Sequence, residues 1–190
     1  DDLQPVRRLH DRFAASAATL AAGPPGEVTL PFVTLSRVQL LAPVLLPSKI
    51  IGVGLNYRDH AAEQNKPLPE APLLFSKAPS CLQAPGGTIG LTDDLVQVDA
   101  EAELAFVIGR PGRAIPVAAA ADHIAGYTCF NDISNREAQY KDKQFFRGKS
   151  IDTGGPCGPW LVTPDELPPE ALGLRITCRW NDVLMQSSNT

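Results

Sequence analysis

The sequence predicts a β-rich α+β fold with many turns. Its 190 residues include 18 prolines and 15 glycines, which divide the chain into short segments. Residues 101–108 (EAELAFVI) show the clearest strand pattern, and residues 174–180 (LRITCRW) alternate as a half-buried strand does.

Composition sets limits on the class of protein. Apolar residues make up 44% of the chain and charged residues 20%, close to the average of soluble globular proteins. A net charge of −4 without a basic run argues against nucleic acid as a partner. No stretch approaches the ~18 apolar residues of a membrane span. The chain starts at Asp1 without a signal-peptide pattern, and we expect a cytoplasmic protein.

The four cysteines are widely separated and form no C-x-x-C pair. This spacing fits reduced, packing cysteines better than a disulfide framework or a zinc site. The residues are Cys81, Cys129, Cys157 and Cys178.

The first part of the chain is expected to be separate from the rest. Residues 5–22 have the spacing of an amphipathic helix, and the sequence GPPG at 23–26 ends it. We predict a small N-terminal subdomain with its linker over residues 1–45, followed by a catalytic domain over residues 46–190.

Four elements are expected between residues 49 and 108. Residues 49–55 predict a buried strand, residues 59–64 a short helix, and residues 72–77 a second strand. Residues 101–108 predict a strand that is apolar on both faces beyond its two glutamates, as in the interior of a sheet.

The remaining elements follow from local signals. The Ala-rich residues 117–124 predict a helix that Gly126 ends, and residues 126–131 predict a strand. Ser134 begins an S-x-x-E capping box, so a helix is expected to start there. The strand at 174–180 precedes a turn at Asn181-Asp182. The chain stops at Thr190 directly after a strand-like piece, and we expect the C-terminal part of the domain to be missing.

Glu101 and Glu103 are the most informative pair. In a strand their side chains point the same way, roughly 7 Å apart. Two carboxylates on one side of a buried strand repel each other and lose hydration, which a bound divalent cation would compensate. The alternative is a solvated strand end with two exposed glutamates.

Asp132 is a candidate third ligand. It follows the strand at 126–131 and precedes a helix, the kind of strand-end position where sites are built. Three carboxylates with waters would suit Mg²⁺ or Mn²⁺. The alternative role of Asp132 is that of a turn or cap residue.

Other polar residues have spacings that fit a site. Arg136 and Gln139 share a helix face and could bracket a carboxylate or carbonyl group, unless that face is simply solvated. His60 and Glu63 also lie at i, i+3, so the carboxylate could orient the imidazole as a general base, or both could belong to a surface helix. Lys149 could stabilise an oxyanion or be a solvated lysine.

Taken in order, these segments resemble the fumarylacetoacetate hydrolase superfamily, including its 2-hydroxyhepta-2,4-diene-1,7-dioate isomerase and acylpyruvate hydrolase-like members. The resemblance spans residues 41–190. It rests on residues 49–63 (KIIGVGLNYRDHAAE), 101–109 (EAELAFVIG), 126–136 (GYTCFNDISNR), 146–152 (FRGKSID), 158–163 (GPWLVT) and 186–190 (QSSNT).

The resemblance implies a mixed β-roll with flanking helices, usually as a homodimer, and a set of site residues. Mg²⁺ or Mn²⁺ would be held by Glu101, Glu103 and Asp132. The remaining implied roles are catalysis by His60, Glu63 and Lys149, with the first two on a mobile segment, and substrate binding by Arg136, Gln139 and Tyr57. Ala100 departs from the family, which often has an aromatic residue there, and the later T-G-T-P-type substrate loop is absent.

The resemblance also implies a small 2-oxo acid as substrate. Because His60 and Glu63 are both present, we favour metal-dependent hydrolysis of a C–C bond in an acylpyruvate or fumarylacetoacetate-like compound. Decarboxylation or isomerisation of a 2-oxo (di)acid on the same metal site is the alternative. A non-catalytic homologue is a further alternative of a different class.

Overall fold

A computed structural model describes residues 34–190. The chain divides into two units, residues 1–39 and residues 40–190. The helix expected at residues 5–22 lies outside the described residues, and the predicted boundary after residue 45 stays a prediction. Of the first unit, the structure describes a short 3-10 helix, η1 (Leu35–Arg37).

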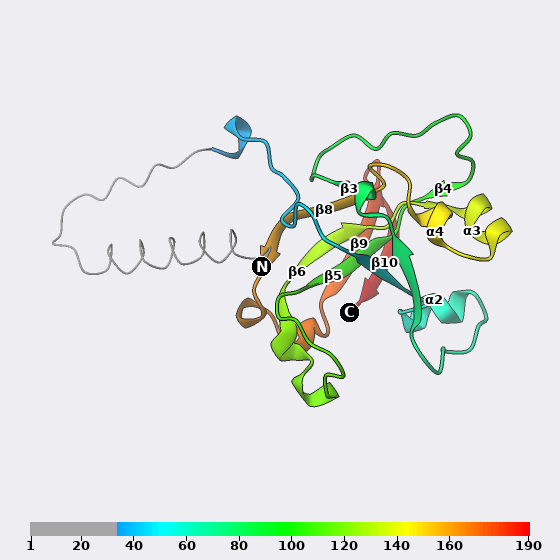
Figure 1. Cartoon of the computed structure of the whole chain (residues 1–190). Coiled ribbons are helices and arrows are strands. Elements are labelled where there is room, and N and C mark those ends of the chain that lie inside the picture. Colours follow the sequence, from blue (N-terminus) through cyan, green and yellow to red (C-terminus); the bar gives the residue numbers. More distant parts are fainter. Residues whose placement is uncertain (1–33) are drawn as a thin grey trace. The chain divides into compact units, whose positions relative to one another are not determined.

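A four-stranded mixed sheet forms the centre of the second unit (Figure 1). Its order is β3 (Leu82–Gln83), β8 (Gly155–Val162), β6 (Ile124–Asn131) and β5 (Ala102–Ile108). β3 pairs with β8 in parallel, whereas the other pairs are antiparallel. A core cluster on this sheet consists of Ala42, Phe130 and Cys157, with Ile50, Leu82 and Ala105 packed against it.

Three two-stranded sheets accompany this central sheet. β1 (Ile50–Gly54) pairs with β2 (Leu73–Lys77), and β4 (Val98–Asp99) pairs with β7 (Ser134–Asn135). β9 (Arg175–Trp180) and β10 (Val183–Asn189) form a hairpin. Its two turn residues, Asn181 and Asp182, have φ of 47° and 64°, which confirms the predicted turn.

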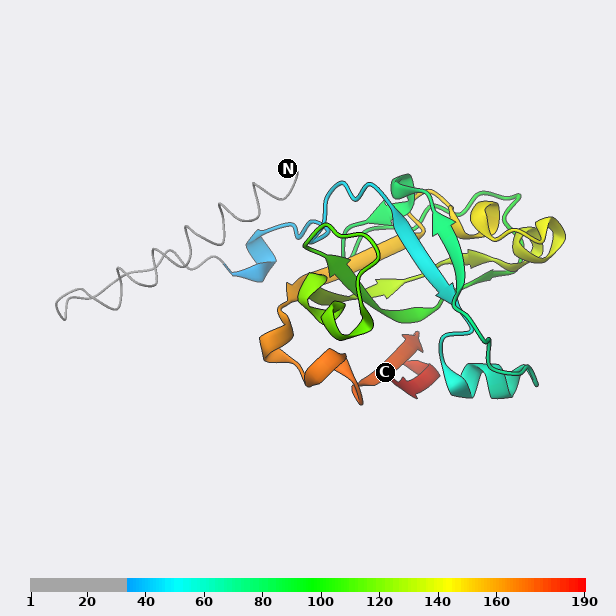
Figure 2. The same cartoon turned by 60° about the horizontal axis from the view of Figure 1, so that its bottom comes forward.

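Short helices connect these strands (Figure 2). The α-helices are α2 (Arg58–Glu63), α3 (Arg136–Asp142) and α4 (Phe146–Lys149). The 3-10 helices are η2 (Pro79–Cys81), η3 (Val117–Ala119), η4 (Ala121–His123), η5 (Pro164–Glu166) and η6 (Pro169–Ala171). Within residues 34–190, no helix combines the length and apolar composition needed to cross a bilayer. The predicted β-rich α+β fold is confirmed.

Three predictions of local structure are wrong. The Ala-rich residues 117–124 form η3 and η4 rather than one helix, because so short a segment without an apolar stripe gains little from packing as a helix and Ile124 already pairs in the sheet. The cap of α3 is Asn135, whose side chain accepts from the backbone N–H of Ala138, so the capping box at Ser134 does not form. Sequence reasoning also missed β8 and α4.

The third correction concerns β5, which we expected inside its sheet. Among the described strands it pairs only with β6 and is the edge of the sheet. Phe106 and Ile108 are each 56% exposed. An apolar pattern on both faces of a strand does not reveal how many neighbours that strand has.

Candidate functional site

Glu101, Glu103 and Asp132 converge at one end of the central sheet. Each offers a carboxylate oxygen within 4.8 Å of those of the other two. The cause is the β5–β6 register, in which Ala102 pairs with Asn131. The backbone N–H of Asp132 then donates to the carbonyl of Glu101 at 2.9 Å. Antiparallel pairing thus brings together carboxylates that are 29 to 31 positions apart in the sequence.

Two lysines reach this carboxylate cluster. The Lys149 ammonium donates to Glu101 Oε2 at 2.6 Å and to Asp132 Oδ2 at 2.7 Å. The Lys77 ammonium donates to Asp132 Oδ1 at 2.6 Å and to the backbone carbonyl of Lys149. Lys77, Asp132 and Lys149 are 1%, 0% and 2% exposed, so these ion pairs are buried. Such pairs avoid the large cost of an isolated buried charge.

Close packing of α4 against α3 positions Lys149. A Cβ atom at Gly148 would lie 2.7 Å from the backbone nitrogen of Gln139, so only glycine permits this approach. The other side of α4 is fixed to the end of β2, because the N–H of Ala78 donates to Ser150 Oγ at 2.9 Å.

The two glutamates differ in their electrostatic surroundings. Burial opposes ionisation of Glu101, but the charges of Lys149 and Arg136 outweigh this and lower its pKa. Burial, reinforced by the charges of Asp132 and Glu101, raises the pKa of Glu103 to about 8. Among residues 34–190 no cationic side chain forms an ion pair with Glu103. Glu103 is therefore the carboxylate of the cluster that has no ion-pair partner in this part of the chain.

This donor set fits a divalent cation. When all three carboxylates are ionised, they and the ammonium groups of Lys77 and Lys149 leave one net negative charge, and Arg136 with Asp99 adds one charge of each sign. All the offered ligand atoms are oxygens. Hard cations such as Mg²⁺ prefer oxygen ligands of this kind. Such an ion would supply the positive partner that Glu103 does not have among the described residues.

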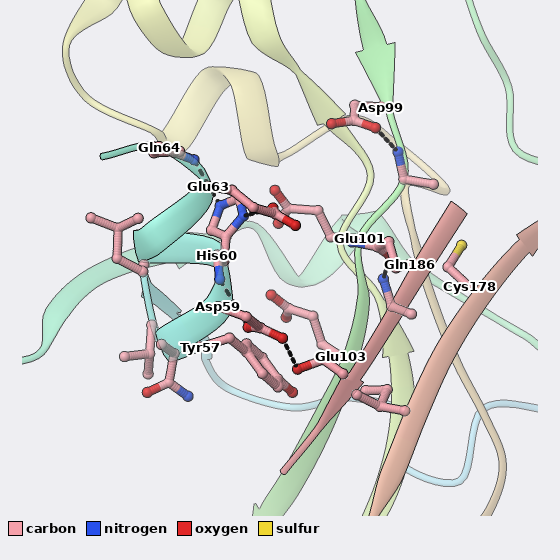
Figure 3. Close-up of a pocket in the computed structure, with 18 of the residues that line it drawn as sticks. Tyr57, Asp59, His60, Glu63, Gln64, Asp99, Glu101, Glu103, Cys178 and Gln186 are labelled. Atoms are coloured by element: carbon pink, nitrogen blue, oxygen red, sulfur yellow. Dashed lines mark hydrogen bonds and ion pairs between the residues drawn. The ribbon is translucent and has the colours of Figure 1, made fainter. Parts of the chain in front are cut away.

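A pocket of about 450 Å³ opens beside the carboxylates. Its walls come from α2 and the segment before it, from β5, from α3, and from the β9–β10 hairpin. Figure 3 shows Glu103 on β5 and Glu101, directly before this strand, projecting toward α2, which carries His60 and Glu63. All the predicted site residues except Asp132 line this pocket: Tyr57, His60, Glu63, Glu101, Glu103, Arg136, Gln139 and Lys149. Their individual roles stay predictions.

A chain of hydrogen bonds fixes the His60 ring. Lys66 can only donate, so its contact of 2.6 Å identifies Gln64 Oε1 as the acceptor. The Gln64 amide nitrogen must then donate to His60 Nε2, 2.8 Å away. The imidazole proton therefore resides on Nδ1, which lies 3.7 Å from Glu63 Oε2. In this arrangement Nε2 of His60 accepts from Gln64, and it becomes available as a base once Gln64 moves.

Arg136 and Gln139 are engaged with protein groups. The Arg136 guanidinium donates to Asp99 at 2.6 and 3.0 Å, to Glu101, and to Gln139 Oε1 at 2.9 Å. Substrate binding by Arg136 would require exchange of one of these contacts, whereas Gln139 keeps its amide nitrogen available to donate. The predicted third member of this group, Tyr57, is half-buried, and burial raises the pKa of its phenol.

Sequence reasoning missed two features of the site. The β9–β10 hairpin contributes Gln186, whose Oε1 accepts from the N–H of Ala102, and Ser188, whose hydroxyl donates to Asp59 on α2 at 2.6 Å. Lys77 was also missed. The available signal was a lysine at the end of the largely apolar strand LLFSK, but sequence does not show which way such a side chain points.

Replacing Lys77 should have a large effect on stability. Lys77→Met leaves the Asp132 carboxylate with one counter-charge fewer and the Lys149 carbonyl without its donor. Breaking a buried ion pair typically costs about 3–5 kcal/mol, and we expect a loss of that order in chemical denaturation. Lys141→Met, on the exposed face of α3, is the control and should change stability by less than about 0.5 kcal/mol. Equal losses in the two variants would contradict the structural role of Lys77.

Comparison with known proteins identifies a matching family model and related sequences. Residues 49–190 match the family model "Fumarylacetoacetate (FAA) hydrolase C-terminal". Mitochondrial oxaloacetate tautomerase fahd2 of Xenopus laevis is 47% identical over 158 residues, covering 82% of this chain and 49% of the relative. Human mitochondrial oxaloacetate tautomerase FAHD2A is 43% identical over 163 residues, covering 85% and 52%. The chain thus spans about half the length of these relatives.

Solved structures agree with this relationship. The 5-carboxymethyl-2-hydroxymuconate delta-isomerase from Mycobacterium smegmatis has a TM-score of 0.72 and 43% identity, covering 82% of this chain and 60% of that one. The 2-hydroxyhepta-2,4-diene-1,7-dioate isomerase from Mycobacterium marinum has a TM-score of 0.73 and 36% identity, covering 88% and 60%. The shared sequence, the shared fold and a family model that spans most of the chain place this protein in the fumarylacetoacetate hydrolase family.

Proposed function

We propose that this chain carries the active site of a divalent-metal-dependent enzyme that moves a proton beside the 2-oxo group of a small diacid, as in keto–enol tautomerisation of oxaloacetate. The observation that carries the proposal is the partly buried Glu101–Glu103–Asp132 cluster beside a pocket that also contains His60. The names of the relatives, oxaloacetate tautomerases and isomerases, favour this reaction among those that the site could perform.

The charge balance of the cluster supports an anionic substrate. With all three carboxylates ionised, they and Lys77 and Lys149 would carry one net negative charge, which a divalent cation would convert to one net positive charge. A 2-oxo carboxylate would then be attracted to the site, and the enolate formed by loss of a proton would be stabilised there. Oxygen-only ligands favour Mg²⁺ or Mn²⁺.

The residues of the chain have distinct roles in this proposal. When bound, the cation would act as a Lewis acid on the 2-oxo oxygen. Lys149 places its ammonium at the carboxylates, close to where negative charge would develop on the substrate. Gln139 offers an amide nitrogen for a substrate oxygen. His60 Nε2 would take the proton from the enol hydroxyl and deliver it to the adjacent carbon, or move it from that carbon to the oxygen in the reverse direction, while Glu63 stabilises the imidazolium.

Hydrolysis of a C–C bond in an acylpyruvate is the second candidate. The observation that favours it is the same His60–Glu63 pair, because a base that accepts a proton from carbon can also activate water. Decarboxylation needs no such base, since the electron pair comes from the bond to the departing CO₂. The three reactions therefore need the same metal site and differ in whether they need the His60–Glu63 pair on α2.

A substrate screen tests the proposal. Purified protein is incubated with enol-oxaloacetate, with acylpyruvates and with keto-oxaloacetate, each with Mg²⁺, Mn²⁺ or EDTA. We expect loss of enol absorbance to be accelerated by either metal and to return to the uncatalysed rate in EDTA. Acylpyruvate cleavage without tautomerisation would favour the second candidate. No turnover of any substrate would favour a non-catalytic homologue.

Two further expectations belong to this proposal. A homodimer is expected in solution, and sedimentation velocity reads out that state. The cytoplasmic location stays a prediction, and the tautomerases named above carry a mitochondrial designation instead.

A further inference from the structure

We propose that Ser188 is a positioning residue for α2: through Asp59 it holds this helix so that His60 faces the carboxylate cluster. Ser188 acts through another side chain and not on the substrate. The effect on catalysis rests on the proposed function, in which His60 is the base, whereas the restraint on α2 does not depend on that proposal.

The helix α2 has few attachments to the rest of the chain. Ala61 is its only buried residue. The hydrogen bonds of its backbone and of the His60 ring end within residues 57–66. Within residues 34–190, the bond from the Ser188 hydroxyl to Asp59 is the one hydrogen bond that joins α2 to a distant segment. The position of α2 therefore depends strongly on this contact.

The contact between Ser188 and Asp59 continues to the backbone of His60. Asp59 Oδ2 accepts from the Ser188 hydroxyl at 2.6 Å, and Oδ1 accepts from the N–H of His60 at 2.8 Å. The Ser188 hydroxyl is also the main cause that lowers the pKa of Asp59. The acceptor is therefore ionised at neutral pH, and a hydrogen bond to a charged group is stronger than one between neutral groups.

The strand β10 is attached at a second point, beside the carboxylates. Gln186 Oε1 accepts from the N–H of Ala102 at 2.8 Å, and Ala102 lies between Glu101 and Glu103 in the chain. Residues two apart in a strand point to the same side, and both Gln186 and Ser188 line the pocket. β10 therefore links β5 to α2 and sets the position of α2 relative to the carboxylates.

Loss of the Ser188 contact should affect the rate rather than metal or substrate binding. A general base must come within about 2.6–3.2 Å of the atom whose proton it takes. A small displacement of α2 moves His60 out of this range, and such displacements are costly for catalysis. The Ser188 hydroxyl bonds to Asp59 and not to a member of the carboxylate cluster, so metal affinity should persist.

The first test is steady-state kinetics of three variants. Ser188→Ala should lower kcat about tenfold, the order expected for one hydrogen bond to a charged group, with KM and Mg²⁺ affinity near their wild-type values. Ser188→Thr keeps the hydroxyl on a residue that suits a strand, and it should recover most of the rate. Ser80→Ala removes an exposed hydroxyl outside the pocket lining and should behave as wild type.

The second test is hydrogen exchange of the metal-free protein, which measures the restraint without any reaction. Backbone amides of α2 should exchange about tenfold faster in Ser188→Ala than in wild type, whereas those of β6 should be unchanged. In an Asp59→Ala background, adding Ser188→Ala should change neither exchange nor kcat further, because the partner of the hydroxyl is already absent.

The possible outcomes separate this inference from the proposed function. Unchanged exchange of α2 in Ser188→Ala overturns the inference, as does a full further effect of that change in the Asp59→Ala background. A raised KM at constant kcat would place Ser188 against the substrate, and faster exchange with wild-type kinetics would show that the contact does not position His60. A wild type without turnover overturns the proposed function, while exchange of α2 still decides whether Ser188 restrains the helix.

Discussion

Glu103→Gln is expected to abolish metal binding and turnover while the protein stays folded. The substitution replaces one of the three candidate ligand carboxylates with a neutral amide, and this is the carboxylate of the cluster that has no ion-pair partner among the described residues. Titration of Mg²⁺ by calorimetry should show no saturable heat, and enol-oxaloacetate should ketonise at the uncatalysed rate. Metal affinity equal to that of wild type would exclude Glu103 as a ligand.

Comparison with Glu101→Gln in EDTA separates the two glutamates. Glu101 accepts hydrogen bonds from Lys149 and Arg136, so its replacement should lower the melting temperature even without metal. Glu103→Gln should instead raise it. Between the ordinary pKa of 4.5 and the folded value of about 8, folding of the wild type takes up a proton at Glu103. Wild-type stability therefore falls as pH rises through this window, and a glutamine avoids that loss.

The contrast should grow with pH. At pH 4.5 the two proteins should have similar stability, and by pH 8 Glu103→Gln should be clearly the more stable in EDTA. Thermal denaturation over this range provides the measurement. A Glu103→Gln variant that melts below wild type throughout would show that its carboxylate stabilises the metal-free fold.

His60→Ala should lower kcat for tautomerisation, and for acylpyruvate cleavage if that reaction occurs, by about 10²- to 10⁴-fold, the usual contribution of a general base. The ring lies in the pocket wall with Nδ1 directed to Glu63, which leaves Nε2 as the nitrogen that can accept a proton. Any decarboxylation of oxaloacetate should be much less affected. Metal affinity and KM should stay near their wild-type values, because His60 is not part of the carboxylate cluster.

His123→Ala is the matched control for this variant. His123 contacts the carbonyl of Arg110, lies outside the pocket lining, and should be replaceable without loss of rate. Glu63→Gln should lose less than His60→Ala, since a glutamine can still orient the ring but stabilises the imidazolium less. Losses below about tenfold for His60→Ala in both reactions would mean that another group acts as the base.

Much of this site could be predicted from the sequence because several of its residues are close to one another in the chain. The i, i+2 spacing of Glu101 and Glu103 places both on one side of a strand, and the i, i+3 spacing of His60 and Glu63 places both on one helix face. The structure has both arrangements. The third carboxylate, Asp132, was a candidate because it follows a strand, but its distance from Glu101 depended on strand pairing.

Predictions failed where a local signal had alternatives that only packing could decide. Ser134 and Asn135 can both cap a helix, and the pairing of β7 with β4 places Asn135 at the start of α3. The apolar faces of β5 fitted an interior strand, yet it forms a sheet edge. In each case the competing structures have similar local energies, so long-range contacts select between them.

The sequence by itself therefore determined the β-rich fold, the family, and the residue types that could hold a metal and move a proton. Tertiary structure decided how those groups are charged and restrained. It brought Lys77 from β2 to Asp132, left Glu103 without an ion-pair partner among residues 34–190, and placed the Arg136 guanidinium against Asp99 and Glu101. The physical reason is that burial and ion pairing depend on which segments meet in space, whereas the periods of strands and helices depend only on neighbours in the chain.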